Sequence, residues 1–100
     1  MHNAYSMPHA HSEKAFRIEG RVQGVGFRWW TRSHALRLKL EGTVRNRDDG
    51  SVEVQARGES DGLQQLERLL RSGPRGADVR TVQEIEPTPS STAGFQIVSS

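Results

Sequence analysis

The stretch that most restricts the fold of this chain is a run of glycines between two patterned segments. It reads Gly20-Arg21-Val22-Gln23-Gly24-Val25-Gly26-Phe27-Arg28. Apolar and polar residues alternate before it, as in a strand, and apolar residues recur at helical spacing after it. The first four amides of a helix have no acceptor within the helix, so such a turn leaves N–H groups free. These amides, the helix dipole and the Arg28 guanidinium together predict a site for a tetrahedral anion.

The two patterned segments predict one strand and one helix. In residues 15–22, Phe16, Ile18 and Val22 share a face, which is typical of a strand covered on one side. In residues 27–38 an apolar stripe at spacings of three and four predicts a helix. The stripe consists of Phe27, Trp30, Thr31, Ala35 and Leu38. Trp30 is therefore expected in the core, whereas Trp29 falls outside the stripe and is expected to be partly exposed near the anion site.

The rest of the chain predicts four more strands and a second helix. The strands cover residues 42–46, 51–57, 77–86 and 95–98, and the helix follows Ser60 as its cap and ends at Gly73-Pro74. Asp-Gly at 49–50 indicates a hairpin between the first two of these strands. A slip in the alternation of residues 77–86 indicates a bulge. This order predicts a ferredoxin-like α+β fold, with two helices on one face of a mostly antiparallel sheet and a short extra C-terminal strand.

Length and composition limit the classes of function. A chain of 100 residues suits one domain, which we place at residues 14–100, with a disordered N-terminal tail at 1–13. The absence of cysteine excludes disulfides and thiolate chemistry, and no apolar run approaches the roughly 20 residues needed to span a bilayer. Residues 1–12 lack the pattern of a secretory signal, so a cytoplasmic protein is expected.

Two features leave a metal open as an alternative. The tail holds His2, His9 and His11, but a tail without metal function is favoured because no fixed backbone brings the imidazoles together. Asp48 and Asp49 are adjacent carboxylates in a turn, which are usually solvated. No metal site is predicted.

The charge distribution favours a small anionic ligand. The net charge is +2, and residues 13–57 hold ten Lys/Arg against six Asp/Glu, whereas residues 58–100 hold four against six. Nucleic acid is not an expected partner, because the chain lacks a continuous basic stripe and the strands at 15–22 and 51–57 lack interleaved aromatic residues for base stacking.

Asn46 is a second candidate site residue, because it ends the strand before the hairpin. Asparagine at this position often only stabilises a turn. Its amide nevertheless has a donor and an acceptor, so it is also suited to hold a water molecule and a phosphoryl oxygen at once.

Two motifs at this separation resemble the signatures of the acylphosphatase family. Residues 22–28 resemble the first signature. Residues 42–58 resemble the second, which is Gly-x-Val-x-Asn followed after three residues by Gly-x-Val and a later Gly. The similarity extends over about residues 14 to 98. Lys39 departs from the pattern, because a glycine commonly ends the first helix at that point.

The resemblance implies a reaction and a site. Acylphosphatases have the ferredoxin-like fold and hydrolyse the carboxyl–phosphate bond of acyl phosphates without metal or cofactor. Arg28 is implied to be the catalytic arginine and Asn46 the residue that orients the attacking water. A phosphate cradle is implied at Gly20, Arg21, Val22, Gln23, Gly24, Val25, Gly26 and Phe27. No histidine or carboxylate lies in the catalytic positions of either motif, so an oxygen of the substrate phosphate is the candidate acceptor of the water's proton.

The expected partners are an acyl phosphate and inorganic phosphate, with no nucleic acid and no membrane, and the expected oligomeric state is a monomer. Two rival functions remain: a non-catalytic module that binds phosphate or another anion, and a nucleic-acid-binding ferredoxin-like domain. Turnover of an acyl phosphate separates the enzyme from both.

Overall fold

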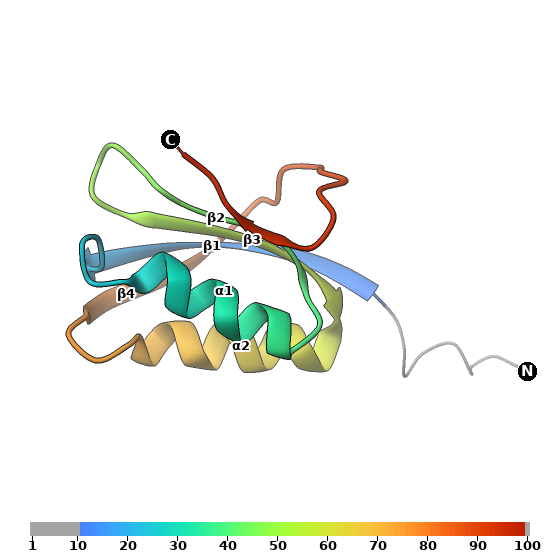
Figure 1. The fold of residues 1–100 in the computed structure, drawn as a ribbon, viewed down its shortest axis with the longest axis horizontal. Coiled ribbons are helices and arrows are strands. Elements are labelled where there is room, and N and C mark those ends of the chain that lie inside the picture. Colours follow the sequence, from blue (N-terminus) through green and yellow to red (C-terminus); the bar gives the residue numbers. More distant parts are fainter. Residues whose placement is uncertain (1–10, 100) are drawn as a thin grey trace, which may run out of the picture.

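A computed structural model describes residues 11–99, which form a sheet with two helices on one of its faces (Figure 1). The element order matches the predicted order. The elements are β1 (His11–Arg21), α1 (Phe27–Arg37), β2 (Glu41–Asn46), β3 (Val52–Glu59), α2 (Ser60–Ser72), β4 (Asp78–Ile85) and β5 (Phe95–Ile97).

The sheet has the strand order β4-β1-β3-β2-β5. The central strand β3 is antiparallel to both of its neighbours, β1 and β2, and β4 is antiparallel to β1. Only the short β5 pairs in parallel, with β2. The predicted ferredoxin-like arrangement, a mostly antiparallel sheet with an added last strand, is confirmed.

Alternation along the strands gives the sheet an apolar face under the helices and a polar face on the other side. Phe16, Ile18, Val44, Val52 and Val54 are fully buried and join the leucines of α2 in one core. The leucines are Leu63, Leu66 and Leu70. Burying each such side chain stabilises the fold by about 1.5–3 kcal/mol.

Two predictions at the ends of elements were wrong, and the other bounds differ from the predicted ones by one or two residues. β1 begins at His11, so residues 11–13 pair with β3, whereas we had expected them in the tail. The remaining tail histidines, His2 and His9, lie outside the described residues. Ser60 is the first residue of α2 and not its cap: the cap is Glu59, and its side chain makes no capping hydrogen bond.

The predicted bulge in the fourth strand is confirmed. The register between β1 and β4 shifts between Glu19 and Gly20, which pair with Thr81 and Val79 and leave Arg80 extra. Gly20 is required there, because a Cβ on this residue would lie 2.1 Å from the Asp78 carbonyl oxygen. The bulge therefore turns the end of β1 at the point where the chain enters the glycine-rich stretch.

Helix α1 ends in a left-handed residue that is not glycine. Lys39 has a φ of 62°. Its N–H donates to the Leu36 carbonyl at 3.0 Å, and the Leu40 N–H donates to the Ala35 carbonyl at 2.9 Å. This pair of bonds is the Schellman motif, in which glycine is favoured because it has no Cβ to strain.

Lys39→Gly is expected to raise the free energy of unfolding by about 0.5–1 kcal/mol, because relief of left-handed strain outweighs the greater freedom of glycine in the unfolded chain. Urea unfolding measures the change. Lys39→Ala is the matched control, since it removes the charge and keeps the Cβ. Equal stability of the two variants would contradict the strain at this residue.

Candidate functional site

The glycine-rich stretch forms an open loop between β1 and α1, which we call the glycine loop (residues 22–26). Gly24 and Gly26 have φ of 77° and 76°, and Gly26 caps α1. The first hydrogen bond of the helix runs from the Trp30 N–H to the Gly26 carbonyl at 3.0 Å. The amides of residues 27–29 precede that donor, so they have no acceptor within the helix and are available to an anion.

Space beside the loop is free of protein. A Cβ placed on Gly24 or Gly26 would meet no atom within 4 Å among the described residues. Val22 and Phe27, at the two ends, are buried in the core. The loop is therefore anchored at both ends and open in the middle. Gly20 and Arg21, which the sequence analysis also assigned to the cradle, are the last residues of β1 and pair with β4.

Arg28 is the second residue of α1 and is half-buried. Its side chain makes no hydrogen bond or ion pair with any part of the chain that the structure describes. A cation at a helix N-terminus is disfavoured by about 0.3–1 kcal/mol. An unpaired guanidinium in this position, next to free amides, is suited to bind an anion that contacts both.

Asn46 is the last residue of β2 and pairs with Val52 of β3. Because side chains alternate along a strand, Asn46 lies on the same face as the buried Val44, which is the face covered by the helices. Its Oδ1 is buried and has no hydrogen-bond partner among residues 11–99. A buried acceptor without a partner costs about 1–3 kcal/mol, so this oxygen is suited to accept a hydrogen bond from water or a ligand.

The side chain of Gln23 joins the glycine loop to the hairpin that follows Asn46. Its Nε2 donates to the Arg47 carbonyl at 2.8 Å and to the Ser51 carbonyl at 2.8 Å. Sequence reasoning assigned only a backbone role to Gln23 and missed these two hydrogen bonds. Their sequence separations are 24 and 28 residues. In Figure 1 the loop between β1 and α1 and the turn between β2 and β3 lie at the same end of the sheet.

The predicted hairpin is confirmed, and it is fixed by its own hydrogen bonds. The Arg47 N–H donates to the Ser51 carbonyl at 2.8 Å, and the Ser51 hydroxyl donates to Asp49 Oδ1 at 2.6 Å. Arg17 of β1 also donates to the Asp49 carboxylate. The hydrogen bonds that Asp49 accepts lower its pKa well below its usual range. Those from Ser51 have the largest effect, followed by that from Arg17.

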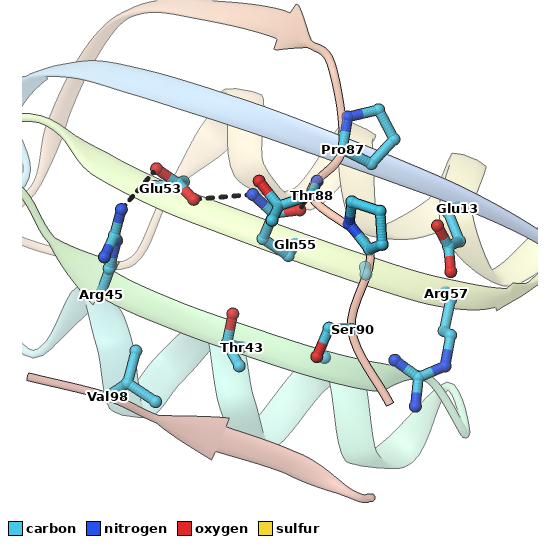
Figure 2. Close-up of a pocket in the computed structure, with 13 residues that line it drawn as sticks. Glu13, Thr43, Arg45, Glu53, Gln55, Arg57, Pro87, Thr88, Ser90 and Val98 are labelled. Carbon is cyan, nitrogen blue, oxygen red and sulfur yellow. Dashed lines mark hydrogen bonds and ion pairs between the residues drawn. The ribbon is translucent and has the colours of Figure 1, made fainter. Parts of the chain in front are cut away.

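A buried charge cluster lies on the opposite face of the sheet, directly behind Asn46. Glu53 is 7% exposed and accepts hydrogen bonds from Arg45, Arg47 and Gln55. Figure 2 shows Arg45 and Gln55 turned toward this carboxylate. Burial alone raises the pKa of Glu53, but the Gln55 hydrogen bond and the two arginines outweigh it, so the pKa lies below its ordinary value.

The sequence contains a signal for this cluster. Continuing the pairing from the hairpin places Arg45 opposite Glu53, which the structure confirms. Two like-charged side chains at alternating positions, Arg45 and Arg47, then reach one carboxylate. What the sequence lacked was any sign that Glu53 is buried.

Glu53→Gln is expected to change how stability depends on pH. The folded pKa lies below the unfolded one, so the carboxylate stabilises the protein fully above the ordinary value of 4.5 and loses this effect as pH falls through the folded pKa. We expect the variant to be less stable at pH 7 and to lose less stability between roughly pH 5 and pH 3. Urea unfolding across this range measures the slope.

The control is Glu86→Gln, at an exposed carboxylate just past β4. The free energy of unfolding of this variant should change with pH as that of the wild type does. A Glu53→Gln slope equal to that of the wild type would show that Glu53 has no lowered pKa.

A groove on the polar face is separate from the glycine loop. It encloses about 280 Å³ between strands β2 and β3 and the segment 87–90, and Glu53, Gln55 and Thr88 are among its lining residues (Figure 2). Neither Arg28 nor Asn46 lines it. The candidate site is thus an open cradle at the sheet end on the helix side, and not a deep cavity.

Three other predictions concern the surroundings of the site. Trp30 packs on Phe27 with ring centroids 5.5 Å apart and is half-buried, as expected, whereas Trp29 is 66% exposed. Asp48 and Asp49 are exposed, as adjacent turn carboxylates usually are. Within the described part of the chain, no three His, Asp or Glu side chains are grouped to hold a metal ion.

None of the helices within residues 11–99 combines the length and apolarity needed to cross a membrane.

Comparisons with known proteins agree with the geometry. The Acylphosphatase family model matches residues 14–97. An acylphosphatase of Pseudomonas aeruginosa is 54% identical over 81 residues, which cover 80% of this chain and 88% of that protein. One from Nocardia farcinica is 45% identical over 89% of this chain and 94% of its own. The solved structure of an acylphosphatase from Coxiella burnetii aligns with a TM-score of 0.82 and 34% identity, over 88% of this chain and 93% of that one.

Proposed function

The chain belongs to the acylphosphatase family, and on this premise we propose that Arg28 and Asn46 carry out its reaction at the glycine loop. The reaction is hydrolysis of an acyl phosphate to a carboxylate and inorganic phosphate. One observation supports the assignment above others. The half-buried Arg28 side chain and the buried Oδ1 of Asn46 both lack partners within residues 11–99. Arg28 follows the loop in the chain, and Asn46 precedes Arg47, whose carbonyl accepts a hydrogen bond from Gln23 of the loop.

Binding of the phosphoryl group is assigned to the loop and Arg28. The free amides of residues 27–29 and the helix dipole favour an anion beside the loop. Arg28 provides two parallel N–H donors to two phosphoryl oxygens. The amides are held in place by the backbone before the substrate arrives, and together with Arg28 they stabilise the charge that spreads over the phosphoryl oxygens in the transition state.

Positioning of the water is assigned to Asn46. Its Oδ1 accepts a hydrogen bond from the water, which turns a lone pair of the water oxygen toward phosphorus. The new P–O bond forms as the bond from phosphorus to the acyl oxygen breaks, and the electron pair leaves with the carboxylate. The proton of the water passes to a phosphoryl oxygen. A carboxylate is a good leaving group, so no protein acid is required.

The protein is proposed to act as a cytoplasmic monomer on small acyl phosphates. Its lack of cysteine suits a reducing compartment, and its excess of positive charge lies in residues 13–57, where the loop and Arg28 are found. Nucleic acid and membranes are not expected partners.

Arg28→Ala is expected to lower kcat/KM for benzoyl phosphate by about 10²–10³, because one preorganised charged donor is lost. The inhibition constant of inorganic phosphate should rise as well. Arg28→Lys should restore little, since lysine keeps the charge and loses the bidentate geometry. Arg68→Ala, at an exposed arginine of α2, is the matched control and should behave as wild type.

Asn46→Ala is expected to lower kcat by a similar factor and to leave phosphate inhibition nearly unchanged, because the water and not the phosphoryl group loses its partner. Gln64→Ala, which removes an exposed amide from α2, is the control. Normal turnover by both Arg28→Ala and Asn46→Ala would refute the assignment. Phosphate binding without turnover by the wild type would instead identify a non-catalytic anion-binding module.

The chelator test addresses metal dependence. Hydrolysis of benzoyl phosphate is expected to proceed at the same rate with and without EDTA, because the loop amides and Arg28 supply the charge stabilisation. Loss of activity in EDTA that returns on adding Mg²⁺ or Zn²⁺ would contradict this mechanism.

A further inference from the structure

We propose that Gln23 is a positioning residue, whose side chain holds the glycine loop at a fixed position relative to Asn46, the residue proposed to bind the water. This inference rests on the roles proposed above for the loop and for Asn46. It assigns to Gln23 a function in the reaction that does not require contact with the substrate.

The first argument is the pair of hydrogen bonds. Gln23 Nε2 carries two hydrogens, and both are used at 2.8 Å, one on the Arg47 carbonyl and one on the Ser51 carbonyl. These carbonyls belong to the two residues that close the hairpin, since the Arg47 N–H also donates to the Ser51 carbonyl. A single amide thus binds both strands of the hairpin at its base.

The second argument is the place of these carbonyls relative to Asn46. Arg47 directly follows Asn46, and Ser51 directly precedes Val52, the residue that pairs with Asn46. The loop is therefore attached one residue from Asn46 on the β2 side and one residue from its partner Val52 on the β3 side. Movement of the loop relative to the hairpin would change the distance between the bound phosphoryl group and the water.

The third argument is how little else holds the middle of the loop. Gly24 and Gly26 have open space beside them, and neither has a side chain to pack. Val25 is only partly buried against the core. The hairpin, in contrast, is held firmly by Asp49 and by the Glu53 cluster. The hydrogen bonds of Gln23 therefore fix the position of the loop relative to this hairpin.

Gln23→Met tests the proposal, because methionine has a similar length and cannot donate. We expect kcat for benzoyl phosphate to fall by about 10- to 100-fold, since a small misplacement of reacting groups has effects of this size. The inhibition constant of inorganic phosphate should stay within about threefold, because the loop amides and Arg28 are still present. Gln23→Glu, which has the same shape and no N–H to donate, should lower kcat likewise, while its added negative charge raises the inhibition constant of phosphate.

A double-mutant cycle separates positioning from a merely structural role. In the Asn46→Ala background, Gln23→Met should change kcat by less than about threefold, because the residue that it aligns is gone. An equal loss of kcat in both backgrounds would overturn the proposal. So would an unchanged kcat in the single variant, or a loss confined to phosphate affinity.

The control is Gln96→Met. Gln96 also donates from its side chain to a backbone carbonyl, that of Ala93, but lies on β5. It should leave kcat unchanged. Circular dichroism melting and phosphate inhibition establish that each variant is folded. If Gln23→Met does not fold, Gln23→Glu replaces it in the kcat measurement. Full activity of Asn46→Ala would refute the proposed role of Asn46 alone, while the single Gln23 variants would still decide whether the loop needs its attachment to the hairpin.

Discussion

The antiparallel pairing of β3 with both of its neighbours is the constraint on which the rest of the structure depends. β1 and β2 are separated in the sequence by helix α1, yet both run opposite to β3. Ile18 and Asn46 are therefore paired with the same residue, Val52. Because the two flanking strands point the same way, the loop after β1 and the hairpin after β2 meet at one end of the sheet.

The same pairing separates the proposed site from the charge cluster behind it, because the two lie on opposite faces of the sheet. On the helix side of this sheet end, Arg28 and the Oδ1 of Asn46 have no partners within residues 11–99. On the polar side, the buried carboxylate of Glu53 accepts hydrogen bonds from Arg45, Arg47 and Gln55. Unsatisfied groups destabilise a fold, and proteins tolerate them where a ligand completes them. The cluster behind the site joins β2, β3 and the hairpin residue Arg47 through one carboxylate.

Much of the site could be predicted from the sequence because its signals are local. Glycines before a helical stripe predicted the loop, and Asp-Gly between alternating segments predicted the hairpin that follows Asn46. The errors concern interactions that depend on distant partners. β1 starts at His11 because β3 extends to Glu59 and pairs with it. Ser60 does not cap α2, because the chain leaves β3 at Glu59 and the helix begins at once.

The sequence by itself determined the kinds of element, their order and the family, since backbone preferences, periodicity and two short motifs carry that information. It also predicted an anion site at the loop. Only the tertiary structure decided which groups lack partners and which are held. The free Oδ1 of Asn46, the burial of Glu53 and the bond from Gln23 to the hairpin all depend on contacts between segments that are far apart in the sequence. Such contacts leave no periodic trace in the sequence, because each depends on the position of a single side chain relative to a distant backbone.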